Sequence, residues 1–205
     1  MTETIHLKII IVGDSGTGKT SIIKRYTTNE FSNTLATIAP AYYSKLFKSN
    51  GNKFQINIWD LPGQDRTQII QSHFARDTEG IIYCCDVTNI QSRDNLKVWE
   101  NELKSKEDIE NVKKIIVENK CDLLGDESNY NDDINSLGLF SKELQCLNFY
   151  RTSAKLGFNI DVAIEYLIDQ IIKDLKEKEI KENYKPNNRK TLSNKKKDKN
   201  RKCCK

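Results

Sequence analysis

The stretch that decides the fold is LKIIIVGDSGTGKTSIIKRY, residues 7–26. It starts with an apolar run, passes through a loop that contains three glycines, and then places apolar side chains at Ile22, Ile23 and Tyr26. A continuous apolar run is typical of a parallel strand that is buried on both faces, and the later spacing fits one face of a helix. We therefore predict a strand over residues 7–13 and a helix from about Lys19 to Thr27.

The loop between these two elements has the spacing of a phosphate-binding loop, G-x-x-x-x-G-K-[ST]. Its glycines let successive backbone N–H groups face one anion, and the following helix adds the positive end of its dipole. Lys19 is predicted to reach the β- and γ-phosphates of a nucleotide, and Thr20 to ligate Mg²⁺. The predicted phosphate contacts are Gly13, Asp14, Ser15, Gly16, Thr17, Gly18, Lys19 and Thr20.

The rest of the chain alternates between strand and helix patterns. A period of two around Asn50-Gly51 predicts a β-hairpin made by residues 42–48 and 54–59. Further strands are predicted at 80–86, 112–117 and 149–152, and helices at 92–103, 139–147 and 160–175, with Asn159 as the N-cap of the last helix. The order β-α-β-β-α-β-α-β-α-β-α indicates an α/β fold of the doubly wound, P-loop NTPase type. We expect a mostly parallel six-stranded sheet with one antiparallel hairpin strand and about five flanking helices.

The sequence Asn119-Lys120-Cys121-Asp122 directly follows a predicted strand and indicates which base is bound. Guanine presents two neighbouring donors, N1–H and the 2-amino group, and an ionised Asp122 offers two acceptors in a matching fork. Asn119 is expected to tie this loop to the phosphate loop. Ser153, Ala154 and Lys155, at the end of the last strand, are expected to support the base. A P-loop kinase or ATPase, which would prefer ATP, is disfavoured by Asp122.

Asp60-Leu61-Pro62-Gly63-Gln64 follows the second strand of the hairpin. Asp60 is predicted to hold Mg²⁺, Gly63 to donate its N–H to the γ-phosphate, and Gln64 to orient the attacking water. Thr37 lies in the loop before the hairpin, where its hydroxyl can complete the Mg²⁺ shell. The predicted metal ligands are thus Thr20, Thr37 and Asp60, and the predicted catalytic residues are Gln64 and Lys19.

With these motifs in order (GDSGTGKT, Thr37, WDLPGQD, NKCD and TSAK), residues 7–175 resemble the Rab family of Ras-superfamily small GTPases. The resemblance implies that Phe31 stacks on guanine and that a GTP-dependent effector surface is formed by Ile38, Tyr42, Trp59 and Phe74. It also implies a slow GTPase, with a turnover of about 10⁻⁴ s⁻¹ that an activating protein raises about 10⁵-fold. The implied role is GTP/GDP-switched regulation of vesicle traffic, exerted by a monomer. The implied partners are an exchange factor, a GTPase-activating protein, effectors, and prenylation escort and GDP-dissociation-inhibitor proteins.

Three departures from the family pattern leave a second function open. The spacing from Phe31 to Thr37 is one residue short, Ala39-Pro40 replaces a usual Gly-Val, and Pro62 replaces a usual alanine. Proline fixes φ and removes a backbone donor, so these switch segments are expected to be stiffer. The alternative is a nucleotide-binding interaction module with negligible hydrolysis.

The end of the chain has a different composition from the rest. From Lys181 onward there are eleven lysines and arginines against two acidic residues, so the preceding residues carry a net negative charge. We expect a small GTPase domain at 1–180 and a disordered basic tail at 181–205. The acidic body argues against nucleic acid as a partner.

The paired Cys203 and Cys204 resemble the doubly geranylgeranylated ends of Rab proteins, and two anchoring signals hold a membrane stably. A nuclear-localisation or nucleic-acid patch at residues 195–197, with idle cysteines, is the competing interpretation. The other four cysteines show no metal-ligand spacing and are expected to be reduced. The sequence has no secretory signal and no apolar run of membrane-spanning length. These features predict attachment to the cytoplasmic face of an intracellular or plasma membrane, with a cytosolic pool.

Overall fold

A computed structural model describes residues 4–32, 35–64, 74–124 and 130–183 of the chain. Its core is a six-stranded sheet in the order β2-β3-β1-β4-β5-β6. In chain order the strands are β1 (Thr4–Val12), β2 (Ala41–Ser49), β3 (Asn52–Asp60), β4 (Gly80–Asp86), β5 (Lys113–Asn119) and β6 (Asn148–Arg151). Only β2 runs antiparallel to its neighbour, and the other pairs are parallel. The predicted fold class is confirmed, including the hairpin turn at Asn50-Gly51.

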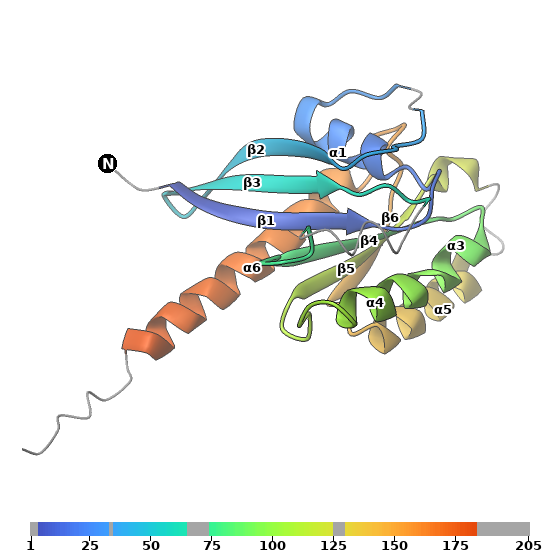
Figure 1. The fold of residues 1–205 in the computed structure, drawn as a ribbon. Helices are drawn as coiled ribbons and strands as arrows, with labels where there is room; N and C mark the ends of the chain where they lie inside the picture. The colour runs from blue at the N-terminus through green and yellow to red at the C-terminus, as the bar shows by residue number, and fades with distance from the viewer. Residues whose placement is uncertain (1–3, 33–34, 65–73, 125–129, 184–205) are drawn as a thin grey trace, which may run out of the picture.

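Helices cover both faces of this sheet (Figure 1). They are α1 (Lys19–Thr28), α3 (Ile90–Asp94), α4 (Leu96–Lys104), α5 (Tyr130–Glu143) and α6 (Ile160–Asn183), with a short 3₁₀ turn at Cys121–Leu123. One core cluster joins the sheet to α1 and α6, and a second joins it to α4 and α5. The adjacent Cys84 and Cys85 belong to different clusters, as expected for neighbours on a strand. Both are free thiols, and each packs against a different helical layer.

Several predicted helix boundaries were wrong. The helix expected at 139–147 is α5, which begins at Tyr130 and ends at Glu143. It stops there because Gln145 takes a left-handed φ of 55° while the Cys146 N–H bonds to the Ser141 carbonyl, which closes the helix end. Gly138, just before the predicted range, lies within the helix, and a Cβ there would lie 3.4 Å from the Phe149 ring.

Three other features of the helices also differ from the prediction. The helix expected at 92–103 is divided at Asn95 into α3 and α4. The last helix continues past Leu175 to Asn183, through residues of high helix propensity and an ion pair between Lys178 and Asp174. Asn159 has a left-handed φ of 56° rather than an extended N-cap conformation, and its side-chain amide donates to the Arg151 carbonyl. The helix expected between β3 and β4 falls largely on residues 65–73, outside the described parts of the chain.

Candidate functional site

A pocket of about 450 Å³ lies where the loops after β1, β3, β5 and β6 meet. Ligands bind at this edge of doubly wound sheets because the carboxyl ends of parallel strands converge there. Most of the predicted nucleotide contacts line it: Ser15, Gly16, Gly18, Lys19, Thr20, Phe31, Thr37, Gly63, Asn119, Lys120, Asp122, Ala154 and Lys155. The pocket lining does not include the other five, which are Gly13, Asp14, Thr17, Asp60 and Ser153. The structure therefore brings the separate motifs to one place.

The phosphate loop is held in shape by its own buried lysine. The Lys19 ammonium donates to the backbone carbonyls of Gly13 (2.8 Å) and Asp14 (3.0 Å), while the Thr17 hydroxyl donates to the Asp14 carbonyl (2.9 Å). Burial lowers the pKa of Lys19, and the nearby Cys84, Asp60 and Asp14 only partly oppose this. Among the described residues this nearly buried ammonium bonds to two carbonyls, which leave its positive charge available to an anion.

Two glycines of the site are required by close approach. A Cβ at Gly18 would lie 2.3 Å from the Asn119 amide nitrogen, and a Cβ at Gly63 would lie 2.3 Å from the Ser15 backbone nitrogen. A larger residue at Gly18 would push Asn119 away from the phosphate loop, and a larger residue at Gly63 would push its own segment away from that loop. Glycine at these positions therefore allows three segments to meet around one ligand.

The three predicted metal ligands lie together. The Thr20 hydroxyl bonds to Asp60 Oδ2 (2.5 Å) and to the Thr37 hydroxyl (2.8 Å), and the Thr37 hydroxyl lies 3.4 Å from Asp60 Oδ2. The other oxygen, Asp60 Oδ1, is buried without a hydrogen-bond partner. Burial raises the pKa of Asp60, and this effect outweighs the hydrogen bond from Thr20 and the charge of Lys19.

This donor set fits Mg²⁺. The ion prefers hard oxygen ligands and is usually held by one or two carboxylates, phosphate oxygens and water rather than by an all-protein cage. The described part of the chain places one carboxylate and two hydroxyls beside the phosphate loop. It contains no cluster of three or more His, Cys, Asp or Glu side chains that could hold a metal ion. An unpartnered buried carboxylate oxygen is the atom that a cation would satisfy.

Asn119 joins the base half of the site to the phosphate half. Its side-chain amide donates to the Thr17 carbonyl (3.0 Å), and its side-chain oxygen accepts from the Ala154 N–H (3.1 Å). The expected tie between this loop and the phosphate loop is thereby confirmed. The Ala154 N–H thus helps to hold Asn119, and the support of the base by residues 153–155 stays a prediction.

The Asp122 carboxylate is oriented from two sides. The Ser153 hydroxyl donates to Asp122 Oδ1 at 2.6 Å, and the Lys155 ammonium lies 3.8 Å from Oδ2. The side chain is 9% exposed, so the carboxylate is held at the pocket wall with little freedom to turn. A fixed pair of acceptors at this position is what recognition of a donor pair on a purine edge requires.

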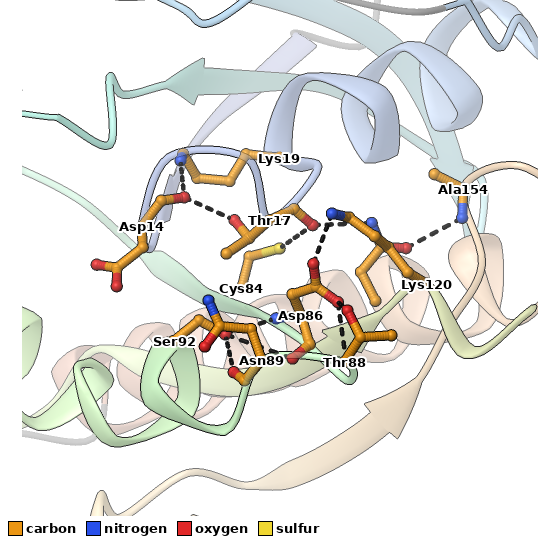
Figure 2. A network of polar contacts seen from close by, with 11 residues as sticks. Asp14, Thr17, Lys19, Cys84, Asp86, Thr88, Asn89, Ser92, Lys120 and Ala154 are labelled. Carbon is orange, nitrogen blue, oxygen red and sulfur yellow. Dashed lines mark hydrogen bonds and ion pairs between the residues drawn. The ribbon is translucent and has the colours of Figure 1, made fainter. Parts of the chain in front are cut away.

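The sequence analysis missed Asp86, at the end of β4. Asp86 accepts a charged hydrogen bond of 2.5 Å from Lys120 (Figure 2). It also accepts hydrogen bonds from the backbone N–H and from the hydroxyl of Thr88. Burial alone would raise the pKa of Asp86, but these bonds outweigh it and lower the pKa below its usual value. Lys120 has a left-handed φ of 67°, and this ion pair fixes its side chain along the pocket. A carboxylate at the end of a parallel strand was the available signal.

Asp14 also has a role that its motif did not reveal. Its carboxylate accepts from the Asn95 amide (2.5 Å) and from the Trp99 indole N–H (3.0 Å). Figure 2 shows this carboxylate pointing away from Lys19, while the Asp14 carbonyl points toward it. The side chain thus anchors the phosphate loop to α4, and the carbonyl bonds within the loop to Thr17 and Lys19.

Three of the four residues predicted to form an effector surface lie together. The ring of Trp59 lies between those of Tyr42 and Phe74, with centroid distances of 5.2 and 5.0 Å. Ile38 is 87% exposed beside Thr37, and Gln64 is exposed next to Gly63. Cys203 and Cys204 lie outside the described residues. Among the described helices, none has both the length and the apolar character needed to cross a membrane.

Comparisons with known proteins agree with this geometry. Residues 8–173 match the family model described as Ras family. The chain is 34% identical over 178 residues to Ras-related protein Rab7 of Gossypium hirsutum, covering 85% of this chain and 86% of that one. It is 31% identical over 183 residues to Ras-related protein Rab-13 of Bos taurus, with 88% of each chain covered. Ras-related protein Rab-10 of Diplobatis ommata is 30% identical over 179 residues, with 87% of each covered. A phosphate loop, a fixed acceptor pair and a Thr-Thr-Asp cluster on this fold, together with these relatives, show that the chain belongs to the Ras family of small GTPases, among Rab-like members.

Proposed function

We propose that this protein binds GTP and GDP with Mg²⁺ and hydrolyses GTP slowly to GDP and phosphate, acting as a molecular switch. The observation that carries the proposal is the cluster of Thr20, Thr37 and Asp60 beside the buried Lys19. These residues come from the phosphate loop, the first switch and the end of β3. A ligand that needs all three couples the shape of the first switch to the nucleotide.

The protein's own residues divide the work of hydrolysis. Backbone N–H groups of the phosphate loop bind the phosphates, and Lys19 supplies the positive charge that stabilises charge on the transferred group. Thr20, Thr37 and Asp60 would hold Mg²⁺, which neutralises phosphate charge when it is bound. Gln64, exposed next to Gly63, orients the attacking water, and Gly63, which lies against the Ser15 backbone, donates its N–H to the γ-phosphate. No arginine occurs between Phe31 and Thr37, so most of the rate enhancement comes from a partner.

The same proposal covers the cellular role. The Rab names of the relatives support a regulator of vesicle traffic that meets an exchange factor, an activating protein and effectors. The Tyr42–Trp59–Phe74 cluster and the exposed Ile38 are proposed to contact effectors. The basic tail and the geranylgeranylated Cys203 and Cys204 are proposed to attach the protein to the cytoplasmic face of a membrane.

A nucleotide-binding module that scarcely hydrolyses GTP is the second candidate. Pro62 is buried directly before Gly63, and Gly63 packs against the Ser15 backbone. Since proline fixes φ, this packing restrains the segment that has to carry Gln64 into place. The observation favours a stiff second switch but removes none of the ligands.

A single-turnover assay separates the two candidates. Purified protein is loaded with GTP at saturating Mg²⁺, its nucleotide content is measured, and conversion to GDP is followed by chromatography. We expect turnover of about 10⁻⁴ s⁻¹, and a slower rate for Gln64→Leu, because the attacking water loses its orienting group. A rate equal to that of GTP in buffer, even with an activating protein, would decide for the module.

Thr20→Asn tests the proposed metal site. The longer amide cannot replace the hydroxyl that contacts both Thr37 and Asp60, so Mg²⁺-dependent GTP binding is expected to weaken at least about tenfold. Fluorescent-nucleotide titrations with and without Mg²⁺ give the measurement. Thr28→Asn, at an exposed position of the same helix, serves as the matched control. Unchanged Mg²⁺ dependence in Thr20→Asn would remove Thr20 from the metal site.

A further inference from the structure

Arg25 lies on the far turn of α1 and reaches across to the loop after β6. Its Nε donates to the Ala154 carbonyl (2.9 Å), and one terminal nitrogen donates to the Lys155 carbonyl (2.9 Å). The other terminal nitrogen donates to the Asn29 carbonyl (2.8 Å) and to the Asn29 side-chain oxygen (3.1 Å). The guanidinium therefore binds two successive carbonyls of the loop after β6 and also bonds to Asn29 at the end of its own helix.

The loop that Arg25 holds also orients the base-reading groups. The Ala154 peptide is bound on both sides, its N–H by Asn119 and its carbonyl by Arg25. The neighbouring Ser153 hydroxyl and Lys155 ammonium both lie against Asp122. The backbone that positions these two side chains is thus fixed from behind by one arginine.

Only an arginine fits this role. Its planar fork presents several donors in a fixed geometry, whereas lysine offers a single flexible charged group. Gly157 borders the arginine side chain, and a Cβ there would make an ordinary van der Waals contact of 3.6 Å with Arg25 Cδ. The helix that carries Arg25 begins at Lys19. It therefore connects the phosphate loop at one end to the loop after β6 at the other. Together with the Asn119–Thr17 bond, this gives a second link between the two halves of the site.

We propose that Arg25 is a positioning residue for base recognition, which holds residues 153–155 so that Asp122 reads guanine and the nucleotide is released slowly. It acts through the loop and does not itself touch the ligand. A partner that displaced the end of α1 would withdraw this support and speed release. The inference rests on the proposed binding of guanine nucleotide and adds a residue that holds the base-reading groups in place.

The test compares full-length Arg25→Ala and Arg25→Lys with Lys24→Ala, a matched control on the preceding position of the same helix. Release of a fluorescent GDP is measured by stopped flow, and affinities for GDP and IDP by competition. IDP lacks only the 2-amino group, so the ratio of the two affinities reports how well Asp122 is oriented. Circular dichroism checks that each variant is folded.

For Arg25→Ala we expect GDP release to be about tenfold to a hundredfold faster, the value of one or more charged hydrogen bonds. The preference for GDP over IDP should fall at least about threefold, Arg25→Lys should resemble Arg25→Ala, and Lys24→Ala should match the wild type. The inference is overturned if the GDP-to-IDP ratio is unchanged in a folded Arg25 variant, or if Arg25→Lys behaves as the wild type. If the wild type itself bound no guanine nucleotide, the proposed function would fail first.

Discussion

Asp122→Asn is expected to lower the affinity for GDP by about 10⁴-fold and to create affinity for XDP. The carboxylate offers two acceptors at the pocket wall, oriented by Ser153 and Lys155. An asparagine replaces one acceptor with an NH₂ donor, which then faces a donor on guanine. A buried mismatch of this kind lowers the binding affinity by about 10⁴-fold. Xanthine carries a carbonyl oxygen where guanine has its 2-amino group, so the new donor has a partner there.

The measurement is a competition titration of GDP, XDP and ADP against a fluorescent nucleotide. Asp108→Asn, at an exposed position on the loop before β5, controls for the loss of one negative charge. If Asp122→Asn kept wild-type affinity for GDP, the carboxylate would not read the base. Uniform loss of GDP and XDP binding would mean that it supports the pocket without setting specificity.

The fold could be predicted because its determinants are local. The run before Gly13, the hairpin signal at Asn50-Gly51 and the apolar spacing after Ile160 each act within one element. Helix ends were less accurate because they depend on backbone conformations such as the left-handed Gln145 and on close approaches such as that of Gly138 to the Phe149 ring. Neither leaves a clear trace in the order of apolar residues.

The candidate site, like the fold, could be predicted from the sequence only in part. Residues that must contact a ligand occur in short motifs, so Lys19, Asp60, Asn119 and Asp122 could be named from the sequence. Residues that act through another side chain come from distant segments. Asp86 meets Lys120, and Trp99 meets Asp14, across 34 and 85 positions of the chain. Only the folded structure shows such pairs, since no spacing rule relates their members.

A cluster remote from the pocket is expected to have the largest effect on stability. The Glu100 carboxylate, 4% exposed, accepts from Lys114 (3.0 Å) and Lys104 (2.9 Å) and from the Tyr83 hydroxyl. Lys114 is 1% exposed, so Glu100→Ala would leave a buried ammonium unpaired. We expect the free energy of unfolding to fall by about 3–5 kcal/mol, a large share of the roughly 5–15 kcal/mol typical of a domain. Urea denaturation of the GDP-bound protein provides the value.

The pH dependence identifies the charge as the cause. Burial tends to raise the pKa of Glu100, but the bonds from Tyr83, Lys104 and Lys114 outweigh it and lower the pKa below its usual value. A carboxylate with a depressed folded-state pKa contributes stability above its unfolded pKa of about 4.3, and this is lost as pH falls through the folded value. Glu100→Gln should therefore lose stability at neutral pH and show a shallower acid transition than the wild type.

Replacing the buried members of the cluster together tests whether the Glu100–Lys114 ion pair itself stabilises the protein. Replacing a buried ion pair by apolar residues of similar volume is often neutral, whereas removing one partner is not. Tyr83→Phe, Glu100→Leu and Lys114→Met combined should therefore recover most of the stability that Glu100→Ala loses, because no polar atom of the cluster remains buried alone. If the triple variant were as unstable as Glu100→Ala, packing rather than the unpaired charge would explain the loss. Recovery would show that Lys114, which reaches from β5 to Glu100 on α4, is tolerated in the core only because Glu100 neutralises it.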